Sequence, residues 1–325
     1  MTRVANEARR GVRTIAPARR LLEITVLSGG PSTEREVSLK SGRAVASALS
    51  SLGHEVHCAD IAPGSLEALA WPADVVFIAL HGAFGENGQV QQLCEDRGLR
   101  YIGSGPRASA LALDKVASRE RFTGAGLKVA KGVVLTSDDA GWEAAEALED
   151  MGLPVVLKPI DGGSSVDVTI ARSAAARDDA VVALLDKYGR ALAEEFVPGR
   201  EFTVSILGRV ALPVLEIIPA REFYDYAAKY ADGSGTRYVF DHGLPPAAVG
   251  ALQSAALAAH DALGCRDLSR VDFIVTPAGA PVVLEVNTIP GFTGHSLLPM
   301  AAARVGLDFP QLVDRIAMMA MARAR

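Results

Sequence analysis

The first third of the chain alternates short apolar runs with helical patterns, and this alternation limits the possible folds more than any other feature. Apolar runs at 22–27, 55–61 and 74–80 have the length and composition of buried strands. Apolar side chains recur at helical spacing over 45–52, and a second helical pattern covers 89–97. Strands that alternate with helices in this way indicate a parallel, doubly wound sheet.

The composition indicates a folded protein with more than one domain. A length of 325 residues corresponds to about two domains, or to three small ones. Hydrophobic residues make up 49% and charged residues 22%, which excludes an intrinsically disordered chain and a disulfide-built mini-protein. The net charge of −5 argues against sequence-independent binding to nucleic acid.

Several features predict a protein of a reducing compartment that does not enter a membrane. Cys58, Cys94 and Cys265 are widely spaced, and their odd number suits inert thiols better than disulfides or a metal site. No stretch approaches the ~20 apolar residues of a membrane span. Residues 1–20 contain six arginines and no apolar core, so we expect a poorly ordered extension rather than a secretory signal.

The middle and the end of the chain show a different order of predicted elements, in which strands are closely spaced. Strand-like segments occur at 129–135, 154–159, 166–171, 192–197, 201–207 and 211–218. Helical patterns occur near 115–125, 138–151, 174–188, 246–264 and 309–322. This order predicts α+β architecture with mainly antiparallel pairing.

The segment Arg270 to Asn287 is the most informative one for chemistry. Two apolar runs flank a Pro/Gly turn, which predicts a hairpin. With a four-residue loop at 277–280, Asp272 lies opposite Glu285 and Arg270 lies opposite Asn287, and all four share one face. Oxygen ligands of this kind suit Mg²⁺ with substrate phosphates. The alternative is a salt-bridged cluster around Arg270, and the register remains an assumption at this point.

A second candidate site is the loop Lys158-Pro-Ile-Asp-Gly-Gly-Ser-Ser165. A strand delivers the lysine, and the following glycines allow backbone N–H groups to approach phosphate oxygens. This is neither G-x-x-x-x-G-K-[ST] nor G-x-G-x-x-G, so an ordinary surface turn is an equal alternative on this evidence.

Two further loops follow strands of the predicted parallel sheet. Ser28-Gly-Gly-Pro-Ser-Thr-Glu34 comes after the first strand, and His81-Gly-Ala-Phe-Gly-Glu-Asn-Gly88 comes after the third. Ligands of open α/β sheets bind beyond the carboxyl ends of strands, so Glu34 and His81 are expected to converge on one ligand. A purely structural histidine is the alternative.

Two other stretches have the composition of functional loops. The aromatic segment 223–230 leads into Gly233-Ser-Gly235 and has the character of a mobile loop that covers a site, or else of a packed aromatic corner. The segment 287–296 leaves the carboxylate strand through Pro-Gly and would carry Ser296 past the proposed metal, unless it is a plain turn.

Taken together, these motifs resemble those of the D-alanine–D-alanine ligases, a family of the ATP-grasp superfamily. The resemblance runs from about Leu22 to the C-terminus. Its motifs are Gly29-Gly-Pro-Ser-Thr-Glu-Arg-Glu-Val-Ser-Leu39, His81-Gly-Ala-Phe-Gly-Glu-Asn-Gly88, Tyr101-Ile-Gly-Ser104, Asp114-Lys115, Lys158-Pro with Gly163-Ser-Ser165, Glu194-Glu-Phe with Gly199-Arg-Glu201, Tyr224-Asp-Tyr with Lys229-Tyr230, Arg270-Val-Asp-Phe273, and Glu285-Val-Asn-Thr-Ile-Pro-Gly-Phe-Thr293 with His295-Ser296.

The resemblance implies a fold of three parts after an extension at 1–20. An N-terminal doubly wound parallel-sheet domain would cover 21–115, a central ATP-grasp lid domain 116–200, and a C-terminal ATP-grasp domain with the metal and substrate site 201–325. The two ATP-grasp parts would clamp ATP between antiparallel sheets. The implied reaction joins two D-alanine molecules through an acyl phosphate, releases ADP and phosphate, and supplies a peptidoglycan precursor for the bacterial cell wall.

The resemblance also implies a nucleotide and metal site. Asp272, Glu285 and Asn287 match ligands of two Mg²⁺ ions, for which Mn²⁺ can substitute, and these ions would offset phosphate charge. The residues that match nucleotide contacts are Lys115 and Lys158 for the phosphates, Ser165 with Ser164 in the loop over the γ-phosphate, Glu194, Phe196 and Val197 beside adenine, and Glu201 at the ribose.

For the amino acids, Glu34 matches the residue that fixes the ammonium group of the first D-alanine, with support from His81. Arg270 and the N–H of Gly291 match the groups that stabilise the tetrahedral oxyanion. The remaining matches are Ser296 and Leu297 for the second carboxylate, and Ser164, Lys229 and Tyr230 for the closure of the lid loop. The family also implies a cytoplasmic homodimer that binds neither nucleic acid nor membrane.

Three positions depart from the family pattern. Asp167 stands where glycine is common, and a carboxylate beside a phosphate loop is unfavourable unless it points away or meets a cation. Asn87 replaces the usual aspartate, and Phe292 replaces the usual methionine. The alternatives are a D-alanine–D-lactate ligase, against which the intact Lys229-Tyr230 pair argues, and a non-catalytic nucleotide-binding relative, which would be expected to lack metal ligands.

Overall fold

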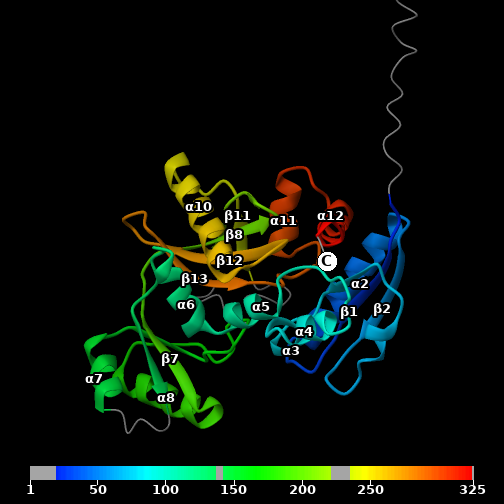
Figure 1. Cartoon of the computed structure of the whole chain (residues 1–325). Coiled ribbons are helices and arrows are strands. Elements are labelled where there is room, and N and C mark those ends of the chain that lie inside the picture. Colours follow the sequence, from blue (N-terminus) through cyan, green and yellow to red (C-terminus); the bar gives the residue numbers. More distant parts are fainter. Residues whose placement is uncertain (1–19, 137–141, 221–234, 324–325) are drawn as a thin grey trace, which may run out of the picture.

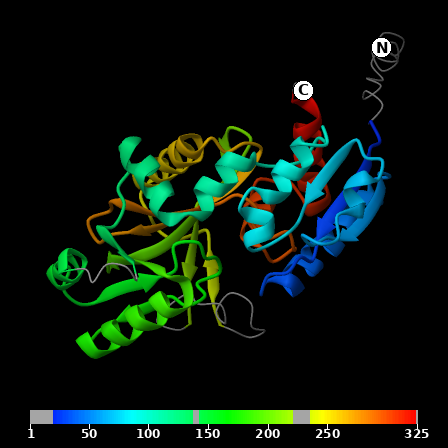
Figure 2. The ribbon, with the colours of Figure 1, turned by 60° about the horizontal axis from the view of Figure 1, so that its bottom comes forward.

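The computed structural model describes residues 20–136, 142–220 and 235–323, with side chains throughout except at 142–145. The described residues form three sheets (Figure 1). The N-terminal sheet and the four-stranded sheet lie at opposite ends of the molecule, and the third sheet lies between them (Figures 1 and 2). The predicted extension at 1–20 falls outside the described residues, apart from Arg20.

The N-terminal sheet is parallel, as the alternating pattern predicts. Its strand order is β2-β1-β3, and the strands cover Glu23–Ser28 (β1), Glu55–Asp60 (β2) and Val75–Ile78 (β3). Every residue of β3 is buried, which explains the continuous apolar run. Its helical segments are α2 (Arg35–Ser51), the 3-10 helix η1 (Glu67–Ala70), α3 (Ala83–Glu86) and α4 (Gln89–Glu95).

A four-stranded antiparallel sheet follows, with the order β4-β7-β5-β6. The strands cover Gly132–Thr136 (β4), Val155–Lys158 (β5), Thr169–Ala171 (β6) and Arg190–Glu195 (β7), and the helices cover Trp142–Asp150 (α7) and Ala174–Tyr188 (α8). Helix α8 packs on β5, β6 and β7 around a separate apolar core. The strand predicted at 166–171 begins only at Thr169, because the preceding residues form the loop of the candidate phosphate site.

The third sheet is antiparallel and six-stranded, with the order β11-β10-β8-β12-β13 and β9 paired to β8. Its strands cover Arg200–Leu207 (β8), Val210–Ala211 (β9), Leu215–Ile218 (β10), Arg237–Val239 (β11), Leu268–Val275 (β12) and Pro281–Asn287 (β13). The single strand predicted at 211–218 is therefore wrong, because the chain breaks it into β9 and β10. The associated helices are α5 (Pro106–Leu113), α6 (Lys115–Gly124), α10 (Pro246–Leu263) and α11 (Leu297–Arg304).

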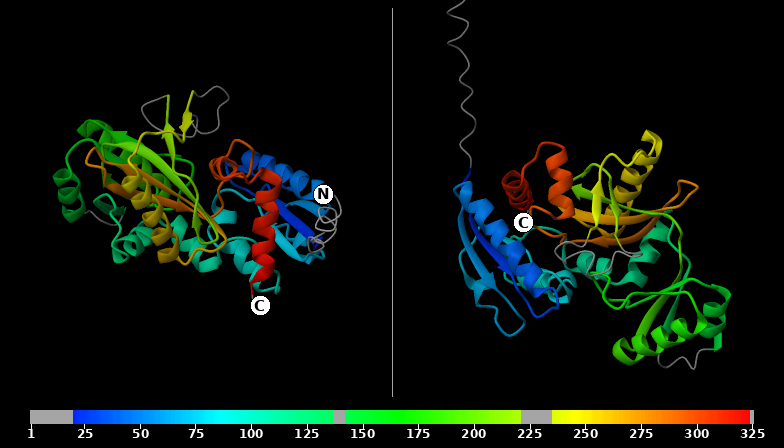
Figure 3. Two further views of the ribbon diagram at one scale, coloured as in Figure 1. Left: turned by 90° about the horizontal axis from the view of Figure 1, so that it is seen from above. Right: turned by 180° about the vertical axis from the view of Figure 1, so that it is seen from behind.

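The last helix, α12 (Phe309–Ala322), returns to the N-terminal sheet. It lies beside α2 in both views of Figure 3 and also contacts β3. Leu312 and Ile316 share one core with Val26 and Phe77 of the parallel sheet. The two ends of the chain thus build one packed unit. The boundaries 21–115, 116–200 and 201–325 remain a prediction.

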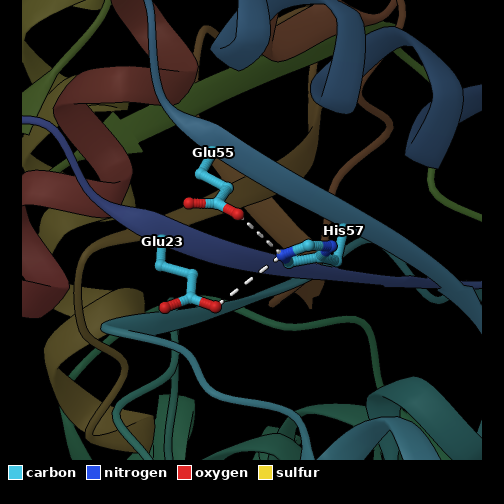
Figure 4. Close-up of side chains that lie close together, drawn as sticks. All are labelled: Glu23, Glu55 and His57. Carbon is cyan, nitrogen blue, oxygen red and sulfur yellow. Dashed lines mark ion pairs between the residues drawn. The ribbon is translucent and has the colours of Figure 1, made fainter.

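The exposed surface of the N-terminal sheet carries a small charged cluster (Figure 4). Glu23 of β1 pairs in register with Glu55 of β2, and His57 lies two residues further along β2. The Nε2 atom of His57 lies 3.7 Å from a Glu23 carboxylate oxygen and 3.6 Å from a Glu55 oxygen. None of the three lines the cavities described below, so we assign the cluster no part in the site.

Candidate active site

The hairpin of β12 and β13 brings the predicted metal-binding residues together. Asp272 pairs with Glu285, and Arg270 pairs with Asn287, as the sequence predicts. The turn itself differs by one residue, because Val275 rather than Thr276 pairs with Pro281. A bulge at Leu284 absorbs this difference and restores the predicted register beyond it.

Asp272 is buried and already held by a cation. Both Nε and Nη2 of Arg270 donate to its two oxygens, at 2.9 and 2.7 Å, and the Thr203 hydroxyl donates to Oδ1 at 2.6 Å. Lys115 adds a second cation, with its Nζ 3.8 Å from a Glu285 oxygen. These contacts offset the repulsion of two carboxylates on facing strands. Asp272 and Glu285 thus belong both to the salt-bridged cluster and to the proposed ligand set.

A cavity of about 380 Å³ lies between the two antiparallel sheets. Apolar residues from both sheets form part of its wall, among them Val156, Ile170, Ile217 and Ile274. Such a slot suits a planar aromatic ring. The predicted nucleotide-binding residues other than Ser164 line it together with two of the predicted metal ligands, namely Lys115, Lys158, Ser165, Glu194, Phe196, Val197, Glu201, Asp272 and Glu285.

Cations concentrate at one end of this cavity. Lys158 is buried and forms an ion pair with Glu194, which also pairs with Arg119. Burial and the neighbouring Lys115 ammonium lower the pKa of Lys158, and the Glu285 carboxylate opposes that shift. An incoming polyanion would relieve the repulsion between the two lysines. The charge of this end of the cavity therefore suits a phosphate group.

A second cavity, of about 520 Å³, adjoins the first. The two share Lys115, Gly162, Gly163 and Glu285 as lining residues. The predicted residues that line the second cavity are Glu34, His81, Ser164, Arg270, Asn287, Gly291, Ser296 and Leu297. Lys229 and Tyr230, together with the predicted lid loop 223–230, lie outside the described residues.

Three loops converge on Glu34 at the start of α2. The Ser32 hydroxyl donates to the backbone oxygen of His81 at 2.7 Å and accepts from the Glu34 N–H at 3.1 Å. The Ser164 hydroxyl, from the loop after β5, donates to Oε1 of Glu34. A Cβ at Gly82 would lie 2.4 Å from that of Ser32, so only glycine permits this approach.

His81 is buried and neutral. Its Nε2 lies 2.9 Å from the Ser41 hydroxyl, and burial lowers the pKa of the ring to about 4. The ring therefore supports the site by hydrogen bonding rather than by charge.

Sequence reasoning missed several acidic residues of the cavities, among them Glu86 and Glu216. Glu86 lines the second cavity and accepts a hydrogen bond from the Gly82 N–H at 3.0 Å, and burial together with the Glu34 carboxylate raises its pKa. Glu216 lines the first cavity and receives two hydrogen bonds of 2.7 Å from Arg200. A signal existed for both, since Glu86 belongs to the His81–Gly88 motif and Glu216 is a lone charge in an apolar run.

The turn before α11 presents Ser296 and the N-terminus of that helix to the second cavity. The Ser296 hydroxyl accepts from the Thr293 N–H at 3.1 Å. A Cβ on Gly291 would lie 2.7 Å from Ser296 Oγ, which accounts for glycine there. N–H groups at a helix start favour a carboxylate ligand, and Leu297 is the first residue of α11.

The fold and site define an ATP-grasp protein, in which two antiparallel sheets enclose a cavity with phosphate-binding character. Family models described as "D-ala D-ala ligase N-terminus" and "D-ala D-ala ligase C-terminus" match residues 60–104 and 122–318. The chain belongs to the D-alanine–D-alanine ligase family.

Individual relatives support the same assignment. D-alanine–D-alanine ligase of Gloeobacter violaceus is 48% identical over 91% of this chain and 98% of its own length. The enzyme of that name from Anaeromyxobacter sp. (strain Fw109-5) is 45% identical over 90% of this chain and 95% of its own length.

Solved structures agree. D-alanine–D-alanine ligase of Bacillus anthracis complexed with ATP has a TM-score of 0.82 at 31% identity, over 93% of this chain and 98% of that one. The VanG D-Ala:D-Ser ligase of Enterococcus faecalis has a TM-score of 0.81 at 29% identity, over 93% of this chain and all of that one. Solved structures of this fold thus include a ligase named for D-serine as well as ligases named for D-alanine.

Proposed function

We propose that this protein joins two D-alanine molecules at the expense of ATP and so supplies D-alanyl-D-alanine for the cell wall. The observation that carries the proposal is that the two cavities adjoin and share Lys115, Gly162 and Glu285 as lining residues. A γ-phosphate placed there would meet an amino-acid carboxylate held beside Glu34. The family assignment and the ATP complex of the Bacillus anthracis relative support this.

In the proposed reaction, the first D-alanine binds with its ammonium near Glu34. Its carboxylate attacks the γ-phosphate, which Lys115, Lys158 and the loop serines hold, and an acyl phosphate forms as ADP leaves. The amine of the second D-alanine, whose carboxylate lies near Ser296 and Leu297, then attacks the acyl carbon. Donors at Arg270 and the Gly291 N–H would stabilise the oxyanion before phosphate departs.

The side chains of Asp272, Glu285 and Asn287 fit a site for Mg²⁺, or for Mn²⁺ in its place. All three offer oxygen donors and lie on the paired strands β12 and β13. Asp272 lines the first cavity, Asn287 lines the second, and Glu285 lines both. Asn287 Oδ1 accepts one hydrogen bond, from the Ile289 N–H at 2.9 Å, which leaves a second lone pair. When bound, such ions would offset the phosphate charge that repels an anionic nucleophile.

We further propose a cytoplasmic homodimer without nucleic-acid or membrane partners. The described cysteines are all free thiols, which suits a reducing compartment. Within the described ranges, the helices are too short or too polar to cross a membrane.

The test is phosphate release from purified protein with Mg-ATP and D-alanine, followed by mass spectrometry of the product. We expect release that depends on D-alanine and a product with the mass of D-alanyl-D-alanine. Mixtures of D-alanine with D-serine or D-lactate run in parallel, because a D-Ala:D-Ser ligase shares this fold. ATP binding without any D-alanine-dependent turnover would contradict the proposal, and a mixed product alone would reassign the second substrate.

A further inference from the structure

Asp167 ties the loop between β5 and β6 to helix α8. Its Oδ2 atom accepts a hydrogen bond from the Lys187 ammonium at 2.6 Å and another from the Tyr188 hydroxyl. Lys187 and Tyr188 are the last two residues of α8. Ser164 and Ser165, which face the two cavities, precede Asp167 in the same loop. The contact therefore fixes the loop to a rigid element.

The charges around Asp167 favour this arrangement. Hydrogen bonds from Lys187 and Tyr188 lower the pKa of its carboxyl, so the group is ionised at neutral pH. A cation in the last turn of a helix is stabilised by the helix dipole. Asp167 lines neither cavity, so its charge is turned away from the phosphate site. The unfavourable carboxylate expected from the sequence is thus neutralised by a neighbouring cation.

The backbone of the loop needs such support. Ser164, Ser165 and Asp167 have φ angles of 51, 56 and 56°, in the left-handed region that L-residues rarely adopt. Residues hold such angles where the surrounding structure fixes them. At the other end of the loop, the Lys115 ammonium donates to the backbone oxygen of Gly162. The two serines therefore lie between two anchors.

We propose that Asp167 is a positioning residue, which holds Ser164 and Ser165 in their site conformation before the nucleotide binds. This inference rests on the proposed function only for its kinetic consequences. A preformed loop spares the nucleotide the cost of ordering it, so the contact should improve nucleotide affinity. Saturating ATP would order the loop in any case, and the chemical step should then be nearly unaffected.

The first test is amide hydrogen exchange over 162–168 in the free protein, which needs no activity. Lys187→Met removes the cation and keeps the stem, and we expect faster exchange in this segment. Lys187→Arg should restore slow exchange, because it restores the cation. Asp186→Asn, an exposed change in the same helical turn, serves as the matched control and should leave exchange unchanged.

The second test is steady-state kinetics with the same variants. An exposed ion pair has a modest effect, so we expect Lys187→Met and Asp167→Asn each to raise the KM for ATP about two- to fivefold. The kcat at saturating ATP should change by less than about twofold. The double variant should resemble either single one, because both remove the same contact.

Equal exchange in the wild type and Lys187→Met would overturn the inference, as would faster exchange in Asp186→Asn to the same degree. A fall in kcat at unchanged KM for ATP would also overturn it. If the wild type lacks D-alanine-dependent turnover, the proposed function fails, and the exchange experiment still decides the role of Asp167.

Discussion

At the residue scale, Arg270 contacts Asp272 and the second cavity at the same time. It holds Asp272 through two hydrogen bonds and lines the second cavity, where the proposed oxyanion would form. Sequence reasoning offered a salt bridge and a functional cluster as alternatives at this position. In the structure, the same arginine side chain forms the salt bridge and lines the second cavity, and its fork has more donors than the carboxylate uses.

Replacement of Arg270 by Gln tests this double role. We expect kcat to fall about 10²- to 10³-fold, because an oxyanion donor is lost. We also expect destabilisation by about 3–5 kcal/mol, because Asp272 remains buried without its cation. Turnover assays and thermal melts measure the two effects. Arg209→Gln removes an exposed arginine paired with Asp261 and is the control. Turnover within threefold of wild type would contradict the catalytic role.

His81 predicts a pH effect on stability. Its pKa is about 4 in the folded protein, below the usual 6.5, so the unfolded chain binds a proton more readily between these values. The stability that the buried neutral ring contributes is therefore present above pH 6.5 and is lost as pH falls toward 4. The loss amounts to about 3 kcal/mol. Denaturant melts between pH 4 and 7 give the free energy of unfolding of wild type and His81→Gln. If this free energy depends on pH equally in both proteins, the prediction is wrong.

At the element scale, turns rather than strands decide the geometry of the second cavity. The turn before α11 brings Gly291 against Ser296, where a Cβ would lie 2.7 Å from the hydroxyl oxygen. The bulge at Leu284 has a similar effect on the hairpin, because it returns Glu285 to its place opposite Asp272. Neither feature follows from the periodicity of apolar residues.

Gly291→Ala should displace Ser296 and weaken binding of the second D-alanine. We expect the KM for D-alanine at this site to rise about tenfold, and the KM for ATP to stay within about twofold. Gly294→Ala, three residues on, is the matched control, since a Cβ there meets nothing within 4 Å. Initial-rate kinetics at varied D-alanine measure both. Equal effects of the two substitutions would exclude the steric explanation.

At the scale of the whole molecule, the C-terminal helix α12 completes the hydrophobic core of the N-terminal parallel-sheet domain. Helix α12 packs on α2 and β3, and the His54 ring lies 2.8 Å from an oxygen of Asp314. The Arg323 guanidinium pairs with Asp267, next to the start of β12. The loops that carry Glu34 and His81 are thereby linked to the sheet that carries the carboxylates.

Ile316→Ala tests this closure. Ile316 is fully buried, so the cavity should cost about 2–5 kcal/mol. We expect the N-terminal sheet and α12 to unfold together in one transition, because they share a core. Circular dichroism would measure the unfolding transition, and amide hydrogen exchange would measure the opening of β1. Arg315→Ala, at an exposed neighbouring position, is the control. Unchanged exchange of β1 would contradict a shared core.

The sequence by itself determined the parallel sheet, the antiparallel architecture and the pairs Asp272–Glu285 and Arg270–Asn287. These depend on local patterns, since side-chain periodicity and turn residues act over short separations. Loop motifs added Lys158, Glu34, His81 and Ser296. The resemblance to the ligase family added the remaining candidate residues, and every described candidate lines one of the two cavities. The roles assigned to them remain predictions.

Only the tertiary structure decided which partners each charged side chain has and which loops contact one another. Asp167 looked unfavourable in the sequence, and its partners Lys187 and Tyr188 lie about twenty residues away on another element. The contact of Ser164 with Glu34 joins residues 130 positions apart. Such contacts depend on the packing of whole elements, because burial and distance rather than residue type set the strength of an electrostatic interaction.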